Sequence, residues 1–180
     1  MELDELRLDC ARKQKKGLHF IAASVVIWLL VLAVELTALP LETKNLLVFC
    51  CTVPLMPLAW ALSKVLGIDF RNSANPLTKL GMLFAMNQLL YILIVMWVFA
   101  AVPGKMLMVF AMVFGAHLLP FGWLYESRAY YVAAVFIPVM ALVVGHVLPL
   151  WALAAIMVVV EAVFALCLAS ESRQLDSSQG

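Results

Sequence analysis

The sequence predicts an all-α integral membrane protein, built as one bundle of six transmembrane helices with a short helix before the first. Hydrophobic residues make up 66% of the chain and charged residues 13%. Soluble domains run near 45–50% apolar and about 25% charged, so water is the wrong solvent for this composition. Six apolar runs follow one another along the chain. Each is long enough to cross about 30 Å of hydrocarbon as a helix, and short turn-forming segments separate them.

The N-terminal segment, residues 1–16, is charged and contains no apolar run. Leu3, Leu6 and Cys10 are three and four residues apart, which is typical of one face of a short amphipathic helix on a membrane surface. A secretory signal is the alternative explanation for the apolar run that follows. It would end in a small-residue cleavage site, and "ELTALPLE" contains none. We therefore expect a surface helix followed by a retained span.

Residues 17–170 contain the predicted transmembrane domain. The six runs cover residues 18–39, 45–63, 77–102, 105–125, 129–147 and 149–169. Proline-containing breaks separate several of them, and Asn75 can cap a helix that has Pro76 in its first turn. Such short links make sequence neighbours antiparallel neighbours in space. Residues 171–180 are polar, and we expect a flexible cytoplasmic tail there.

The distribution of Lys and Arg predicts the orientation. Cytoplasmic loops of membrane proteins are enriched in these residues. With the N-terminus inside, the outer loops hold only Lys44 and Lys105. The inner segments then hold Arg7, Arg12, Lys13, Lys15, Lys16, Lys64, Arg71, Lys79, Arg128 and Arg173. Both termini are therefore expected in the cytoplasm.

Several strings carry a family resemblance, above all "NPLTKLGMLFAMNQLLY" and "GAHLLPFGWLY". With the surrounding sequence, from "KKGLHF" through the sixth run, they resemble an uncharacterised family of small bacterial membrane proteins, domain of unknown function 7010. The resemblance implies the multi-pass topology and a place in the bacterial inner (plasma) membrane. It implies no activity.

The second and fourth runs share a weak sequence similarity. "PLAWALSK" begins at Pro57 and "PFGWLYESR" at Pro120, so that Trp60 matches Trp123. These two helices run in the same direction, as a parallel repeat of hairpins would require. This similarity alone does not distinguish a repeat from coincidence.

Polar residues inside the apolar runs are the candidate functional residues, because ionisable groups in a membrane are costly and usually face the bundle interior. His117 lies about 12 residues into the fourth run, or ~18 Å at 1.5 Å per residue, and Glu161 lies at a similar depth in the sixth. Asn87 and Gln88 occupy the same level in the third run, with Tyr91 one turn further on. We call these five residues the polar layer and expect them to line a substrate-binding site.

The alternative is that single polar side chains only hold helices together. His19 and Glu35 lie near opposite ends of the first run, where their side chains are expected to reach the membrane surfaces. A metal site needs three or four converging ligands, and no such spacing occurs, so we expect neither metal nor cofactor. The net charge of +1 argues against a nucleic-acid partner, and the lipid bilayer is the expected surrounding.

Three functions remain open. The leading hypothesis is a small carrier or permease-like protein of unknown substrate, with no enzymatic activity. The second is an intramembrane lipid-modifying enzyme with His117 and Glu161 as an acid–base pair. The third is a non-catalytic membrane sensor or scaffold. Six short spans are small for a transporter, which makes a homodimer a plausible assembly.

Overall fold

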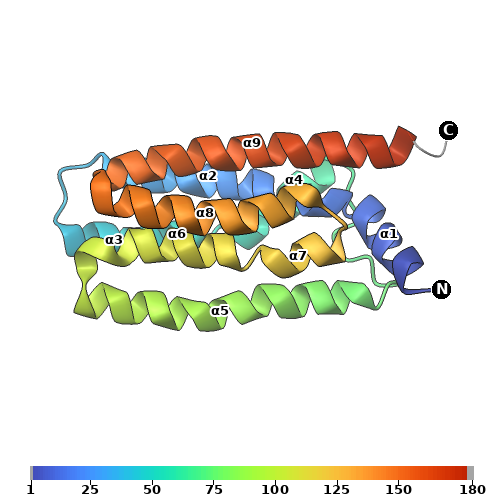
Figure 1. Cartoon of the computed structure of the whole chain (residues 1–180), viewed down its shortest axis with the longest axis horizontal. Coiled ribbons are helices and arrows are strands. Elements are labelled where there is room, and N and C mark those ends of the chain that lie inside the picture. The colour runs from blue at the N-terminus through green and yellow to red at the C-terminus, as the bar shows by residue number, and fades with distance from the viewer. Residues whose placement is uncertain (1, 178–180) are drawn as a thin grey trace.

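Six helical segments of the chain are long and apolar enough to cross a membrane, in a computed structural model that describes residues 2–177. The predicted all-α class is therefore confirmed for this part of the chain. Figure 1 shows the N- and C-termini at the same end of the bundle, as an even number of antiparallel spans requires. We call this end the terminal end and the opposite one the far end.

The helices have the following bounds. In chain order they are α1 (Leu3–Lys13), α2 (Leu18–Glu35), α3 (Leu41–Thr52), α4 (Leu55–Val65), α5 (Leu77–Ala101), α6 (Met106–Ala116), α7 (Leu119–Leu124), α8 (Arg128–Val147) and α9 (Leu150–Ser177), with one-turn 3-10 helices at Lys15–Gly17 and Pro103–Lys105. Spans one, three, five and six are the single helices α2, α5, α8 and α9. Spans two and four consist of two helices each, α3 with α4 and α6 with α7.

The two interrupted spans break at matching positions. If Pro57 is aligned with Pro120, then the Val53–Pro54 break between α3 and α4 falls within one residue of the His117–Leu118 break between α6 and α7. A proline removes one backbone donor and crowds the carbonyl one turn earlier, which explains a break about four residues before each proline. The similarity between the second and fourth spans thus extends from their sequences to the positions of their helix breaks.

Close helix contacts hold the bundle together. α2 packs most extensively on α9, and α6 on α8. At Gly115 of α6, an added Cβ would lie 2.6 Å from Pro138 Cδ and 2.7 Å from Ile137 Cβ of α8. Small residues at such contacts let helix backbones approach closely, which is how membrane helices gain packing energy.

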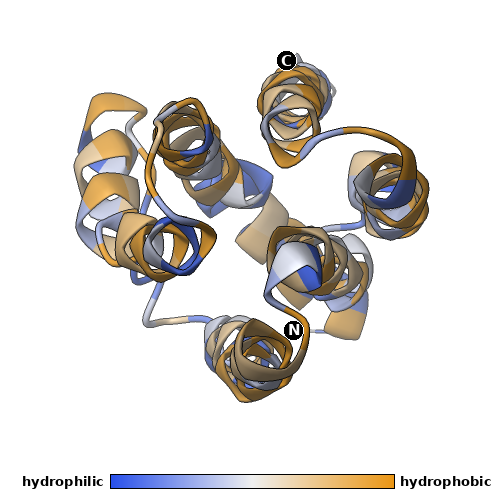
Figure 2. Cartoon of the chain, turned by 90° about the vertical axis from the view of Figure 1, so that its left-hand side faces the viewer, coloured by the Kyte–Doolittle hydropathy of each residue, from blue (hydrophilic) through white to orange (hydrophobic). Residues whose placement is uncertain are grey.

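The outside of the bundle is apolar. Figure 2 looks along the bundle and shows hydrophobic residues on the outward sides of the helices as well as between them. α5 is the least enclosed span: only Val95 and Val98 of this helix are buried, and Figure 1 shows it at the edge of the bundle. Such a surface suits lipid chains rather than water.

The N-terminal helix α1 packs across the terminal end. The Asp9 carboxylate accepts hydrogen bonds from the side-chain amides of Asn75 and Asn72, at 2.8 and 3.2 Å. Arg7 donates to the Trp123 carbonyl oxygen at 2.7 Å. A left-handed turn with φ of 43° at Lys15, 51° at Lys16 and 71° at Gly17 then leads into α2. The predicted helix is present, and its placement on a membrane surface stays a prediction.

The last helix continues beyond the predicted span. α9 runs through Ser177, so residues 171–177, which we assigned to the tail, extend the sixth helix. The remaining residues of that tail, 178–180, lie outside the described part of the chain.

Candidate functional site

Glu161 is completely buried, at 0% exposure, where α9 packs against α2. One of its carboxyl oxygens, Oε2, lies 2.5 Å from the Ser24 hydroxyl oxygen of α2. The other oxygen, Oε1, has no hydrogen-bond partner within residues 2–177. A buried polar atom without a partner carries a free-energy cost of about 1–3 kcal/mol, which protonation of this oxygen would reduce.

The Ser24 hydroxyl can serve either protonation state of Glu161. Its oxygen lies 2.7 Å from the Ile21 carbonyl oxygen and 2.5 Å from Glu161 Oε2. A hydroxyl has one proton to donate and can also accept. When Glu161 is ionised, Ser24 donates to the carboxylate. When Glu161 is protonated, Ser24 can donate to Ile21 and accept from the carboxylic acid. The same heavy-atom geometry therefore fits both protonation states of Glu161.

Toward the far end, the surroundings of this pair are apolar. Trp28 follows Ser24 by one turn of α2, and Met157 precedes Glu161 by one turn of α9; both are buried. The Trp28 ring packs against Phe110 of α6, with 5.7 Å between ring centroids. These apolar side chains separate Glu161 from the far end of the bundle.

Toward the terminal end, the surroundings are polar. Tyr130 of α8 packs its ring edge-on against Phe164, one turn after Glu161, with 4.9 Å between centroids. The Tyr130 hydroxyl donates a hydrogen bond of 3.0 Å to the Lys16 carbonyl oxygen. Tyr130 thus links the level of Glu161 to the turn before α2.

A largely buried ion pair continues this link. The Lys16 ammonium group lies 2.8 Å from a carboxylate oxygen of Glu171, and the two side chains are 6% and 21% exposed. The second Glu171 oxygen accepts the Ala129 backbone N–H at 3.0 Å. Glu171 is ten residues after Glu161 on α9, about 15 Å along the helix axis. We refer to Glu161, Ser24, Tyr130, Lys16 and Glu171 together as the Glu161 site.

Beside this site, a second buried tyrosine anchors the N-terminal segment. The Tyr125 side chain is buried. It donates a hydrogen bond of 2.7 Å to the Gln14 side-chain oxygen. The segment that carries Lys16 is therefore held by two tyrosines, Tyr125 and Tyr130.

The polar layer is only partly brought together. Glu161 lies in the bundle as described, and His117 lies at the break between α6 and α7. The half-buried His117 ring packs near Phe114 and Phe121, and its Nδ1 atom is hydrogen-bonded to the Phe114 carbonyl oxygen. In the described part of the chain, no hydrogen bond joins His117 to Glu161.

The α5 members of the polar layer lie on the outside. Asn87 donates a hydrogen bond of 3.0 Å to the Tyr91 hydroxyl, and both side chains are exposed. Gln88 is half-buried. The structure therefore pairs Asn87 with Tyr91, while the partner of Glu161 is Ser24.

Sequence reasoning missed the actual neighbours of Glu161. Ser24 is the one small polar residue between His19 and Glu35, and that isolation was the available signal. Lys16 and Glu171 lie 155 residues apart, and no local pattern predicts their pairing. His19 and Glu35, expected to reach the membrane surfaces, are 2% and 6% exposed.

Comparison with known proteins gives a family and no activity. No match was found among curated proteins or among solved structures. Residues 3–171 match a family model described as "Family of unknown function (DUF7010)". This match covers nearly the whole chain, so the resemblance carried by the sequence motifs is confirmed: the protein belongs to this family of unknown function.

Proposed function

We propose that this protein is a small proton-conducting carrier of the plasma membrane, in which the Glu161 carboxyl group binds and releases a proton. The observation that carries the proposal is the burial of Glu161 beside Ser24, with one carboxyl oxygen left without a hydrogen-bond partner in the described structure. An ionisable group inside a membrane protein usually marks an ion or substrate path.

Two features favour a carrier over a scaffold. A hydrophobic side chain at position 161 would pack the bundle at lower cost than a carboxyl group, so the carboxyl is better explained by a function than by stability. Spans two and four are also interrupted at matching places. Interrupted helices in related positions are typical of transporters, where they line binding sites and allow movement.

An acid–base enzyme is less well supported. It would need His117 and Glu161 at one reaction centre, whereas Glu161 is hydrogen-bonded to Ser24 and His117 to its own helix. We retain His117 in the proposal as a second proton-binding group. Its location at the break between α6 and α7 gives it a place where helix movement would change its surroundings.

The Lys and Arg distribution gives the proposed orientation. The basic residues gather at the terminal end, in α1, the loop after α4, the starts of α5 and α8, and the end of α9. The positive-inside rule places this end in the cytoplasm. The polar chain through Tyr130, Lys16 and Glu171 then leads from Glu161 to the cytoplasm, and the layer around Trp28 separates Glu161 from the outside.

We further propose that the carrier is a homodimer with α5 at its interface. Asn87 and Tyr91 are exposed in the middle of a largely apolar helix that the rest of the chain leaves mostly uncovered. Polar side chains facing lipid are poorly solvated, and an amide pairs well with the same amide on a second copy. A two-fold axis normal to the membrane would bring the two Asn87 side chains to the same depth.

The experiment that tests the proposed function is proton flux in proteoliposomes that contain a pH-sensitive dye. A potassium gradient with valinomycin supplies the membrane potential. Wild-type protein is expected to acidify the interior faster than protein-free liposomes do. Glu161→Gln keeps the shape and the hydrogen bond to Ser24 but cannot titrate, so it should return the rate to that of protein-free liposomes.

The matched control is Glu35→Gln, which removes a second buried carboxyl group of the same bundle. Glu35 is 6% exposed and lies at the far end, outside the Glu161 site. This variant should conduct as the wild type does. Equal flux for wild type and Glu161→Gln, or wild-type flux no greater than that of protein-free liposomes, contradicts the proposal.

A further inference from the structure

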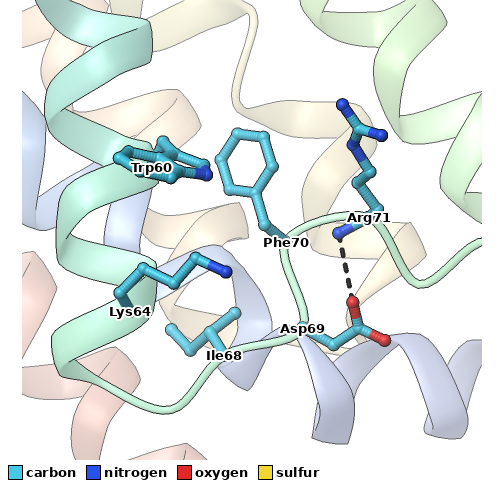
Figure 3. A pocket seen from close by; sticks show the side chains of 6 residues that line it. All are labelled: Trp60, Lys64, Ile68, Asp69, Phe70 and Arg71. Carbon is cyan, nitrogen blue, oxygen red and sulfur yellow. Dashed lines mark hydrogen bonds between the residues drawn. The ribbon is translucent and has the colours of Figure 1, made fainter.

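A pocket of about 370 Å³ opens at the terminal end, between α4 and the loop that follows it. Figure 3 shows Trp60 and Lys64 projecting from α4 on one side and the loop residues Phe70 and Arg71 on the other. The pocket lies apart from the Glu161 site and shares no residue with it.

The pocket presents two cationic side chains. Lys64 and Arg71 are both exposed, and neither forms an ion pair among the side chains that the structure describes. The Lys64 ammonium group lies 5.7 Å from the centre of the Trp60 ring, a cation–π arrangement that holds it over the pocket. The positive charge here is therefore available to an anion.

The one acidic residue of the pocket is turned to the loop backbone. The Asp69 carboxylate accepts the backbone N–H groups of Arg71, at 3.2 Å, and Asn72, at 2.9 Å. Figure 3 shows it directed away from Trp60 and Lys64. These hydrogen bonds shape the loop and leave the pocket cationic.

The loop is also fixed from the N-terminal side. Lys15 donates a hydrogen bond of 2.7 Å to the Leu66 carbonyl oxygen, and the Asp69 N–H donates one of 3.0 Å to the Lys13 carbonyl oxygen. Phe70 packs against His19, with 5.4 Å between ring centroids. The pocket is thus formed before any ligand arrives, which lowers the entropy cost of binding.

An apolar strip adjoins the pocket along the outer face of α4. Met56 and Trp60 are exposed at 48% and 54% and lie four residues apart, on one face of α4. Val53, exposed at 77%, precedes them in the break between α3 and α4. Tryptophan is enriched where hydrocarbon meets the headgroup layer. An acyl chain can lie along this strip while its headgroup reaches Lys64 and Arg71.

We propose that this pocket binds one anionic phospholipid, with its phosphodiester group between Lys64 and Arg71, its glycerol over Trp60 and Phe70, and an acyl chain along α4. Each feature corresponds to one part of such a lipid. The two unpaired cations match the phosphate, the interfacial tryptophan matches the glycerol region, and the apolar strip matches an acyl chain. A soluble phosphate would use only the first of these features.

The test is native mass spectrometry of the intact protein from detergent, titrated with phosphatidylglycerol and, separately, with phosphatidylcholine. Wild type should bind one phosphatidylglycerol with clear preference over phosphatidylcholine. Each basic residue near an anionic lipid contributes about 1 kcal/mol, so Lys64→Gln/Arg71→Gln should weaken this binding about 30-fold. Both side chains are exposed, so the double variant is expected to fold, and its circular dichroism melt checks this.

The matched control is Lys79→Gln/Arg128→Gln, which removes the same charge from exposed positions at the same end, outside the pocket. It should leave phosphatidylglycerol binding within about 2-fold of wild type. An equal loss in both double variants indicates unspecific attraction and overturns the proposal, as does unchanged binding in the pocket variant. Displacement of the lipid by equimolar inorganic phosphate also overturns it, because the site would then recognise a free anion.

Discussion

The hydroxyl oxygen of Ser24 lies 2.5 Å from a carboxyl oxygen of Glu161, although the two residues are 137 positions apart in the chain. This contact joins the first span to the sixth, which are the most extensively packed pair of helices in the bundle. It places a group that can hold a proton where the surroundings change from polar, toward the terminal end, to apolar, toward the far end.

Ser24→Ala should destabilise the protein, because it leaves both carboxyl oxygens of a buried Glu161 without a partner. The expected loss is about 1–3 kcal/mol, measured by thermal unfolding in detergent. Ser63→Ala is the matched control: Ser63 is also fully buried, but its hydroxyl donates only to the Trp60 carbonyl oxygen of its own helix. If both variants melt at the same temperature, the Ser24–Glu161 contact contributes nothing of its own.

The contact between α6 and α8 should be sensitive to a single methyl group. Gly115→Ala puts a Cβ within 2.7 Å of the rigid Ile137 Cβ and the Pro138 ring, so the helices must separate, at an expected cost of about 1–3 kcal/mol. Gly104→Ala is the control, since nothing lies within 4 Å of its added Cβ. Thermal unfolding compares the two, and a Gly115→Ala protein as stable as the control would contradict the close approach.

The six spans could be predicted because length and hydropathy alone decide whether a helix crosses a membrane. The interruption of the second and fourth spans was foreshadowed by Pro57 and Pro120, whose missing N–H groups act one turn earlier. What could not be predicted was the rotation of each helix. α5 is apolar nearly all round, so the shared depth of Asn87 and His117 says nothing about which way either side chain points.

Local sequence patterns explain which residues of the candidate site could be predicted. Glu161 stood out because a carboxyl group in an apolar run has no local partner. Ser24 did not stand out, because a serine hydroxyl in a helix can donate to a backbone carbonyl of the same helix. The 2.7 Å hydrogen bond from Ser24 to the Ile21 carbonyl oxygen is of this kind. Lys16 belongs to a left-handed turn, and only the folded chain brings it to Glu171.

The docking of α1 should depend on pH through Asp9. The hydrogen bond from Lys13, together with those from Asn75 and Asn72, holds the pKa of Asp9 below its ordinary value. A carboxyl with a lowered folded-state pKa stabilises the fold above its unfolded value of about 3.9, and this contribution is lost as the pH falls through the folded pKa. Wild type should therefore melt above Asp9→Asn at neutral pH, and the gap should close as the pH falls below that unfolded value.

Asp4→Asn is the control for this prediction, because the Asp4 side chain is 84% exposed. It should melt with the wild type at every pH. A gap between wild type and Asp9→Asn that stays constant down to acid pH would show that Asp9 acts through its shape rather than its charge.

The proposed homodimer should weaken when α5 loses its exposed polar pair. Asn87→Leu/Tyr91→Phe removes the groups that would pair across the interface, and the dimer dissociation constant should rise about tenfold, as expected for ~1.4 kcal/mol from interhelical hydrogen bonds. Energy transfer between labelled copies in dilute lipid vesicles measures this. Met86→Leu, an exposed apolar exchange on the same helix, should leave the energy transfer unchanged. If wild-type copies show no energy transfer, the protein is a monomer and the proposed homodimer is contradicted.

The most direct test of the central claim is infrared difference spectroscopy of the protein in lipid nanodiscs during a pH titration, in the region where a protonated carboxyl group absorbs. The chain has 11 Asp and Glu residues, and each absorbs in this region when protonated. We predict that one of the carboxyl C=O bands that appear as the pH falls is missing from Glu161→Gln and present in Glu35→Gln. If Glu161→Gln shows the same set of titrating bands as the wild type, Glu161 does not bind and release the proton.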